Sequence, residues 1–145
     1  MQVAAERVGR QGRVVGVDLV AVEPLAQSHA TALVGDLGDP DVLAAVLEQL
    51  GRPADVVLSD AAPKLSGVRA RDEAQCEALT AAILEAIPKL LAPGGAAVMK
   101  TFMGAGLEAV RRRLGTDFQR VQLVRPASTR SGSSEYYLVA LRRRC

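Results

Sequence analysis

The sequence predicts an α/β fold, a doubly wound sheet in which strands alternate with helices. Short runs of Val, Leu and Ala alternate with stretches whose apolar residues recur every three or four positions. Three of the short runs end in a charged residue, at Asp18, Asp60 and Lys100. Buried parallel strands deliver such side chains to the carboxyl edge of a sheet, where open α/β folds bind ligands. The loop between the last two runs is too short for a helix, so the final strands should be antiparallel.

The first third of the chain is expected to form, in order, a helix, two strands and a second helix, at residues 2–10, 13–18, 31–34 and 40–50. Gly9 or Gly12 should end the first helix, because glycine adopts the left-handed conformation of a helix end without strain. Asp39 is placed to cap the second helix, and Pro40 fits its first turn.

The remaining elements are a strand, a long helix, a strand, a short basic helix and two closing strands, expected at residues 55–59, 73–91, 96–100, 107–114, 121–124 and 136–141. A polar loop, 64–72, precedes the long helix, in which Leu79, Ile83 and Ile87 repeat at helical spacing. The run Ala92-Pro93-Gly94-Gly95 should end that helix.

Composition restricts the classes of protein. The 145 residues suffice for one domain with a sizeable core, built here from small aliphatic side chains without Trp. The net charge of +2 does not require a polyanionic partner. Fifteen of the 18 basic residues are Arg, which binds phosphate bidentately, although a GC-rich genome would produce the same bias. The two cysteines have no metal-like spacing, and no apolar stretch reaches membrane-span length, so we expect a soluble cytoplasmic protein.

Two acids follow the early strands. Asp18 ends its strand where a Rossmann-like sheet binds the ribose hydroxyls of a nucleoside cofactor. Asp36 follows the next strand, where its carboxylate would accept a hydrogen bond from an adenine amine. A helix-capping or solvated acid is the alternative for Asp18, and an acid that caps its own turn is the alternative for Asp36.

Asp60, Lys100 and Glu135 are the candidate catalytic residues. Lys100 follows four apolar strand residues at the predicted carboxyl edge, a position that does not suit simple solvation, although a snorkelling edge lysine is the alternative. Glu135 enters the last strand and would otherwise be a solvated turn acid. We find no Ser-His-Asp set, zinc spacing or Walker loop in the sequence.

Several arginines are candidates for phosphate contacts. Arg69, Arg71, Arg125 and Arg130 flank the predicted cleft. The runs 111–113 and 142–144 are interpreted as solvated surface charges.

Taken in order, the motifs resemble the FtsJ/RrmJ family of ribosomal RNA large-subunit uridine 2′-O-methyltransferases. The matching stretches are VDL at 17–19, GDL at 35–37, SDAAPKLSG at 59–67, LAPGG at 91–95, VMKTF at 98–102, RPAS at 125–128 and SEYY at 134–137.

The resemblance implies a class I S-adenosylmethionine-dependent methyltransferase fold, whose sheet usually ends in an antiparallel strand, over residues 1–145 as a single domain. By position Asp18, Asp36 and Asp60 resemble the acids that bind S-adenosylmethionine. Asp60, Lys100 and Glu135 resemble three members of the Lys-Asp-Lys-Glu catalytic set, with Lys100 as the general base. The implied partner is ribosomal RNA or the large ribosomal subunit, without a metal or a membrane, and the implied state is a monomer.

The sequence departs from the family at its start. Family members carry an upstream lysine, a strand and a Gly-rich cofactor loop, which have no counterpart here. That strand normally lies between those ending at Asp18 and Asp60, so its absence would leave them about 10 Å apart. We therefore expect an N-terminally truncated domain.

The same departure bears on activity. Without the upstream lysine, Lys100 would lie between two carboxylates that favour its charged form, so the chain should be a poor catalyst. The alternatives are a non-catalytic RNA-binding remnant and, supported by Asp18 alone, a nucleotide-cofactor oxidoreductase.

Overall fold

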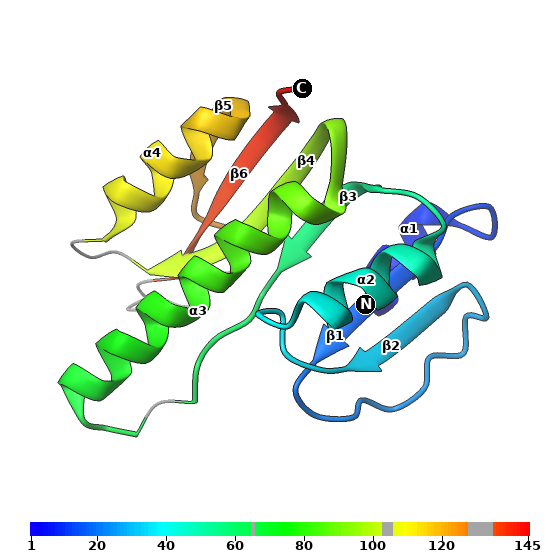
Figure 1. Ribbon diagram of the computed structural model, residues 1–145, viewed down its shortest axis with the longest axis horizontal. Coiled ribbons are helices and arrows are strands. Elements are labelled where there is room, and N and C mark those ends of the chain that lie inside the picture. Colours follow the sequence, from blue (N-terminus) through cyan, green and yellow to red (C-terminus); the bar gives the residue numbers. More distant parts are fainter. Residues whose placement is uncertain (65, 103–105, 128–134) are drawn as a thin grey trace. The chain divides into compact units, whose positions relative to one another are not determined.

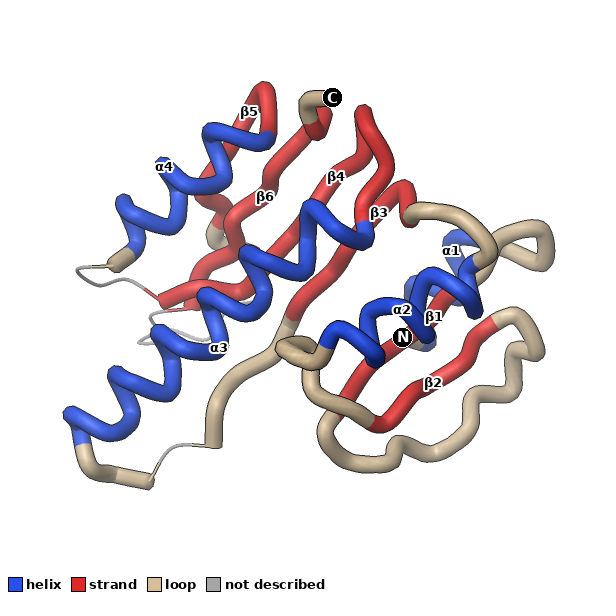
Figure 2. The backbone as a smooth tube through the Cα atoms, in the orientation of Figure 1, coloured by secondary structure: helices blue, strands red, loops and turns tan. Residues whose placement is uncertain are grey.

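The computed structural model describes residues 1–64, 66–102, 106–127 and 135–145, and the chain divides into two compact units, Met1–Ala54 and Asp55–Cys145 (Figures 1 and 2). The expectation of a single domain over residues 1–145 stays a prediction. The elements are, in order, α1 Gln2–Val8, β1 Val14–Asp18, β2 Ala30–Val34, α2 Pro40–Leu50, β3 Ala54–Ser59, α3 Arg69–Leu90, β4 Leu91–Phe102, α4 Leu107–Asp117, β5 Phe118–Val124 and β6 Glu135–Arg143.

The first unit is built on a parallel pair of strands. β1 pairs with β2 from Val14 opposite Ala30 to Asp18 opposite Val34. Both strands therefore end at the same edge. Helices α1 and α2 pack on this pair, and their buried residues are Ala5, Leu43 and Val46.

Helix α2 forms where its end signals predict. The Asp39 carboxylate accepts a hydrogen bond from the backbone N–H of Asp41 at 2.9 Å, and Pro40 occupies the first turn. Gly51 ends the helix in the left-handed conformation, at φ 75°. Gly9 ends α1 with φ 66°, so one of the two predicted glycine stops is confirmed.

The second unit is a four-stranded sheet of order β3-β4-β6-β5, with α3 and α4 on one face (Figure 1). β6 is antiparallel to both β4 and β5, which confirms the predicted antiparallel finish. Ala97 and Met99 of β4 lie opposite Ala140 and Leu138 of β6, and all four are buried. The helices complete this core with buried aliphatic side chains, namely Ile83, Ala86, Ile87, Leu90 and Leu114.

Two elements differ most from their predicted bounds, α3 and β4. Helix α3 begins at Arg69 rather than after the polar loop. The Asp72 carboxylate accepts hydrogen bonds from Ser66 and from the Gly67 N–H, which ties the preceding loop to the start of the helix. Strand β4 begins at Leu91 and includes the run Ala92-Pro93-Gly94-Gly95, which we expected to lie between the long helix and the strand. Gly94 has φ 79°, and a side chain on Gly95 would lie 2.9 Å from the carbonyl of Asp55.

Each sheet has two end strands whose outer edges carry no pairing within the described ranges, β1 and β2 in the first unit and β3 and β5 in the second. β1 pairs with β2 alone, and β3 is an end strand of its sheet. None of the described helices is long and apolar enough to cross a membrane.

Candidate active site

Lys100 lies near the end of β4, in the second unit. The pairing of β4 with β6 places it opposite Tyr137, and it places Phe102 opposite Glu135. The side chain of Lys100 is only 13% exposed, so its ammonium is mostly shielded from water. A shielded ammonium needs charged or polar partners, because burial without them disfavours the charged form.

The partners of Lys100 are the two carboxylates that the sequence singles out. Lys100 Nζ lies 3.1 Å from Asp60 Oδ1 and 3.8 Å from Glu135 Oε1. Asp60 follows β3, and Glu135 begins β6, so three strands contribute to this cluster. The Asp60 and Glu135 side chains are 72% and 43% exposed, so both carboxylates face solvent while the amine lies behind them. The structure thus brings together all three residues predicted to be catalytic.

Tyr137 completes the cluster. Its hydroxyl donates a hydrogen bond to Asp60 Oδ1 at 2.9 Å, the same oxygen that contacts Lys100. Our sequence reasoning did not single out this residue. The signal was present, since residues two apart on a strand share a face and Tyr137 is two residues beyond Glu135.

The cluster shifts the pKa of each of three members. Burial by itself lowers the pKa of Lys100, but its hydrogen bond to Asp60 and the charges of Asp60 and Glu135 outweigh burial and raise that pKa above its usual value. Burial by itself raises the pKa of Asp60, but the hydrogen bonds from Lys100 and Tyr137 lower it on balance. The hydrogen bond to Asp60, with burial, raises the pKa of Tyr137. Lys100 is therefore held as an ammonium at neutral pH.

Asp18 and Asp36 belong to the first unit, at the shared carboxyl edge of β1 and β2. Asp18 Oδ1 accepts a hydrogen bond from the Val20 N–H at 3.0 Å, and Asp36 Oδ1 accepts one from the Gly38 N–H at 2.8 Å. Both acids thus shape their own turns, as the alternative interpretation of Asp36 expects. Both are exposed, and within the described chain the Oδ2 atom of each has no partner. These oxygens fit a ligand that presents hydroxyl or amine donors.

The arginines predicted to bind phosphate have different surroundings. Arg69 forms an ion pair with Glu73 at 2.8 Å, and Arg71 is exposed on the first turn of α3. The Arg125 guanidinium lies over the ring of Tyr136, 5.8 Å from its centroid. Arg130 lies outside the described residues. Among the residues described, no three His, Cys, Asp or Glu side chains are grouped in a way that could hold a metal ion.

The sheet with its closing antiparallel strand is that of a class I methyltransferase. A crystal structure described as a ribosomal RNA methyltransferase from Plasmodium falciparum aligns with a TM-score of 0.77, at 24% identity, over 90% of this chain and 72% of that one. Human methyltransferase-like protein 13 in complex with SAH aligns with a TM-score of 0.52, at 18% identity, over 79% of this chain and 50% of that one.

The chain belongs to the FtsJ-like methyltransferase family, whose model matches residues 1–143. It is 42% identical over 140 residues to the ribosomal RNA large subunit methyltransferase E of Acidithiobacillus ferrooxidans, covering 97% of this chain and 63% of that protein. It is 42% identical over 144 residues to the protein of the same name from Myxococcus xanthus, covering 99% of this chain and 68% of that protein. The chain thus spans just under two thirds of the Acidithiobacillus relative.

Proposed function

We propose that this protein transfers a methyl group from S-adenosylmethionine to the ribose 2′-hydroxyl of a uridine in large-subunit ribosomal RNA. The observation that carries the proposal is the cluster of Asp60, Lys100 and Glu135 at the end of the second unit's sheet. Two carboxylates beside an amine can orient a hydroxyl, and the amine can accept the hydroxyl proton when it is neutral. The names of the two bacterial relatives support RNA as the substrate.

The acids of the first unit would hold the cofactor. Asp18 would accept hydrogen bonds from ribose hydroxyls and Asp36 from the adenine amine, since each has a carboxylate oxygen without a partner among the described residues. Asp60 is the third acid that we assign to cofactor binding, through its exposed carboxylate. When bound, S-adenosylmethionine supplies a methyl group already activated by its sulfonium.

The protein's main chemical tasks are then positioning and proton removal. Asp60 and Glu135 face solvent and would orient the hydroxyl, while Lys100 behind them would take its proton as general base. Only the neutral amine can take that proton, yet both carboxylates raise the pKa of Lys100. We therefore propose that residues 1–145 on their own transfer methyl groups slowly.

The test combines cofactor binding with methyl transfer. Calorimetry of the chain with S-adenosylhomocysteine should show binding that Asp18→Asn weakens. Single-turnover transfer of labelled methyl to large-subunit ribosomal RNA should be slow but measurable, and Lys100→Met should reduce it at least about 100-fold. Lys89→Met is the matched control, because Lys89 lies in the last turn of α3, outside the cluster, and its loss should leave the rate unchanged.

Three outcomes would overturn the proposal. Transfer by Lys100→Met at the wild-type rate would remove the general base from the mechanism. RNA affinity without S-adenosylhomocysteine binding would favour the non-catalytic RNA-binding alternative. Binding of NAD in place of S-adenosylhomocysteine would favour an oxidoreductase.

A further inference from the structure

The small net charge of the chain conceals an uneven distribution. Residues 1–106 contain nine Lys or Arg against 13 Asp or Glu, whereas residues 107–145 contain nine Arg against three acids. The basic excess is therefore confined to the last 39 residues and consists of arginine alone. A one-sided charge distribution of this kind is typical of surfaces that bind polyanions.

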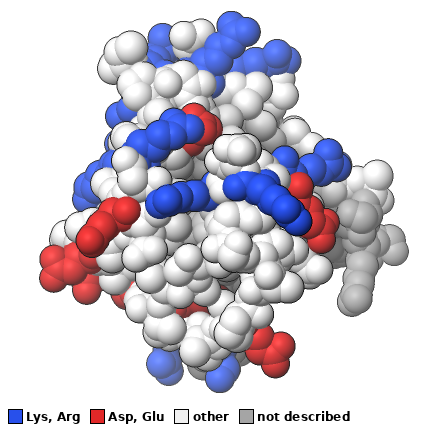
Figure 3. All heavy atoms as spheres, turned by 90° about the vertical axis from the view of Figure 1, so that its right-hand side faces the viewer, with Lys and Arg blue, Asp and Glu red and all other residues white. Residues whose placement is uncertain are grey.

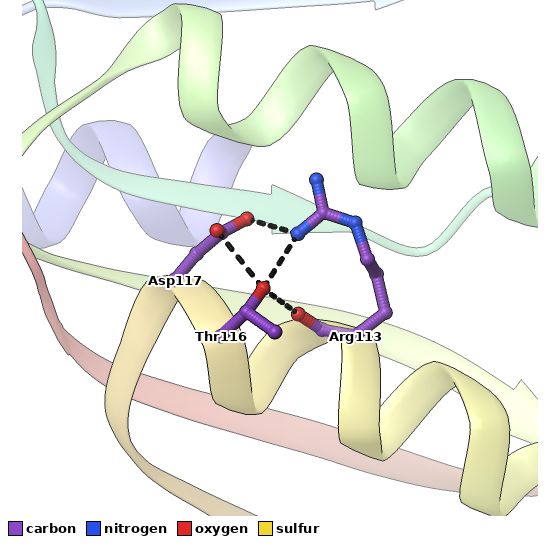
Figure 4. A network of polar contacts seen from close by, with 3 residues as sticks. All are labelled: Arg113, Thr116 and Asp117. Atoms are coloured by element: carbon purple, nitrogen blue, oxygen red, sulfur yellow. Dashed lines mark hydrogen bonds and ion pairs between the residues drawn. The ribbon is translucent and has the colours of Figure 1, made fainter.

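The end of α4 contributes the first member of a cluster at one end of the second unit's sheet. Arg113 Nη1 lies 2.6 Å from Asp117 Oδ2 and donates to Thr116 Oγ1 at 2.9 Å (Figure 4). The Asp117 carbonyl in turn accepts a hydrogen bond from the Arg144 N–H at 2.7 Å. The last turn of α4 thus lies directly against the end of β6.

The pairing of β5 with β6 adds the other members. Phe118 lies opposite Arg143, and Arg120 lies opposite Leu141, so the start of β5 runs beside the arginines that end β6. We name this set the distal arginine cluster: Arg113, Arg120, Arg142, Arg143 and Arg144. Lys and Arg side chains gather at the top of Figure 3, the end of the second unit at which Figure 1 marks the C-terminus.

The cluster has more positive charge than its surroundings neutralise. Its acidic neighbour Asp117 is already paired with Arg113. Within the part of the chain that the structure describes, Arg120 and the arginines 142–144 form no ion pair with an acidic side chain. The guanidinium groups of residues 142–144 are therefore available to an external anion, while that of Arg120 donates to the side-chain amide of Gln122.

The backbone at Arg142 departs from strand geometry. Its φ is 57°, the one positive φ outside glycine among the described residues. A long side chain rarely adopts this left-handed conformation, and such outliers are concentrated at functional positions. Here the deviation interrupts the alternation of side chains along the strand between Leu141 and Arg143, so successive arginines need not point to opposite faces.

We infer that the distal arginine cluster binds the sugar-phosphate backbone of the RNA substrate, away from the reacting nucleotide. The inference rests on the proposed function. Arg143 is six residues from Tyr137 along β6, or about 20 Å at the rise of an extended strand. The cluster would therefore anchor a neighbouring segment of the same RNA and fix its register without reading its sequence.

The chemistry of the surface favours RNA over an acidic protein. The guanidinium group donates two parallel hydrogen bonds to phosphate oxygens, and arginines that bind along an RNA sugar-phosphate backbone need no apolar neighbours. A protein partner would usually require an apolar or aromatic centre to the interface. Phe118, the aromatic residue between these arginines, is only 1% exposed and is not available for that purpose.

The test compares two triple variants of the full chain with the same change in charge. Arg142→Gln/Arg143→Gln/Arg144→Gln removes three members of the cluster, and Arg7→Gln/Arg10→Gln/Arg52→Gln removes three arginines of the first unit. Fluorescence anisotropy would measure the affinity for a large-subunit ribosomal RNA fragment over a range of KCl concentrations. We expect the cluster variant to bind at least about tenfold more weakly at low salt and its log K against log[salt] slope to be shallower by about two to three. The control should keep the wild-type slope.

Further measurements separate this inference from the proposed function. Calorimetry with S-adenosylhomocysteine and transfer at saturating RNA should be unchanged in the cluster variant, and circular dichroism would establish that it folds. If the cluster variant does not fold, Arg142→Lys/Arg143→Lys/Arg144→Lys is used in its place. This variant should bind RNA more weakly than wild type but with the same dependence of log K on log[salt], because the positive charges remain while the bidentate guanidinium donors are lost.

If the wild-type chain binds RNA and transfers the methyl group, and the cluster variant binds RNA with the same affinity, the inference is overturned while the proposed function stands. Equal losses in the two triple variants would also overturn it, because net charge rather than this surface would then set the affinity. A wild-type chain that binds neither RNA nor S-adenosylhomocysteine would instead refute the proposed function, and the inference with it.

Discussion

At the scale of single residues, the exposure of the Lys100 cluster shows why it matters more for chemistry than for stability. The Asp60 carboxylate is 72% exposed, and water screens an ion pair in such a position. Exposed pairs contribute roughly 0–1 kcal/mol to folding. The amine, at 13% exposed, is nonetheless shielded enough for its partners to set its protonation. Substitutions here should therefore change reactivity far more than the free energy of unfolding.

The pH dependence of transfer follows from the raised pKa of Lys100. Below that pKa the neutral fraction of the amine grows tenfold per pH unit, so we expect the single-turnover rate to rise with unit slope from about pH 7 to about pH 9. Glu135→Gln removes one charge that raises the pKa and should shift the rise to lower pH. Glu108→Gln, on α4 beside Arg111, is the control and should leave the profile in place. A rate independent of pH over this range would contradict Lys100 as the base.

The same pKa shift has a consequence for stability with a defined sign. A raised folded-state pKa stabilises the fold below the ordinary lysine value of 10.5, and this stabilisation is lost as the pH rises through the folded value. Wild type should therefore lose slightly more unfolding free energy than Lys100→Met between pH 9 and pH 12, by less than about 1 kcal/mol. Urea titrations of both proteins at each pH would measure this difference, and parallel curves would count against the ion pair.

Tyr137→Phe tests the hydrogen bond that sequence reasoning missed. Loss of the hydroxyl removes a donor that lowers the pKa of Asp60, so that pKa should rise toward its ordinary value of 3.8. A lowered carboxyl pKa stabilises the fold above the ordinary value and loses this effect as the pH falls through the folded value, so any difference in stability belongs below about pH 4. Carbonyl NMR titration of Asp60 would measure the shift. Tyr136→Phe, which removes the hydroxyl of the neighbouring residue in the chain, is the control and should leave the Asp60 titration unchanged.

At the scale of elements, α2 offers the sharpest test of a local rule. Asp39→Ala removes the side chain that accepts the Asp41 N–H, leaving that donor without its cap. We expect a loss of about 1 kcal/mol in the free energy of unfolding, measured by urea denaturation. Asp41→Ala removes a first-turn acid that does not cap the helix, and its cost should be only a few tenths of a kcal/mol. Equal costs for the two variants would show that the cap is not what stabilises this end.

The elements that the sequence predicted well are those whose signals are local. Asp39 and Pro40 occupy the start of α2 as predicted, because these residue types mark a helix start by their own chemistry. The loop before α3 is held instead by Asp72, which reaches back to Ser66 and Gly67, a contact that composition does not indicate.

The candidate site divides in the same way. The chain order of strands predicted that Asp60, Lys100 and Glu135 would converge, because each lies at a strand end. Which further residue joins them depends on register, and the pairing that places Tyr137 opposite Lys100 is set by contacts remote in sequence. The extension of β4 through Pro93 and Gly94 likewise depends on contacts with residues remote in sequence, which the local sequence does not indicate.

At the scale of the whole molecule, the unpaired strand edges have a physical consequence. β3 is an end strand whose Val56 and Leu58 side chains are 53% and 61% exposed, and β1 pairs with β2 alone within the described ranges. An exposed apolar strand edge presents free N–H and C=O groups beside hydrophobic side chains, which is a template for pairing with another chain. Residues 1–145 in isolation should therefore self-associate as their concentration rises.

Val56→Lys tests this directly, because a charge on an edge strand opposes pairing with a second copy. Light scattering and analytical ultracentrifugation over a concentration series should show less association than in wild type, with little change in unfolding free energy, since Val56 is already exposed. Val3→Lys is the matched control, as Val3 is 69% exposed but lies on helix α1, which has no strand edge. If both variants reduce association equally, net charge rather than the β3 edge causes the reduction. If Val56→Lys associates as strongly as wild type, the edge of β3 does not pair with a second chain.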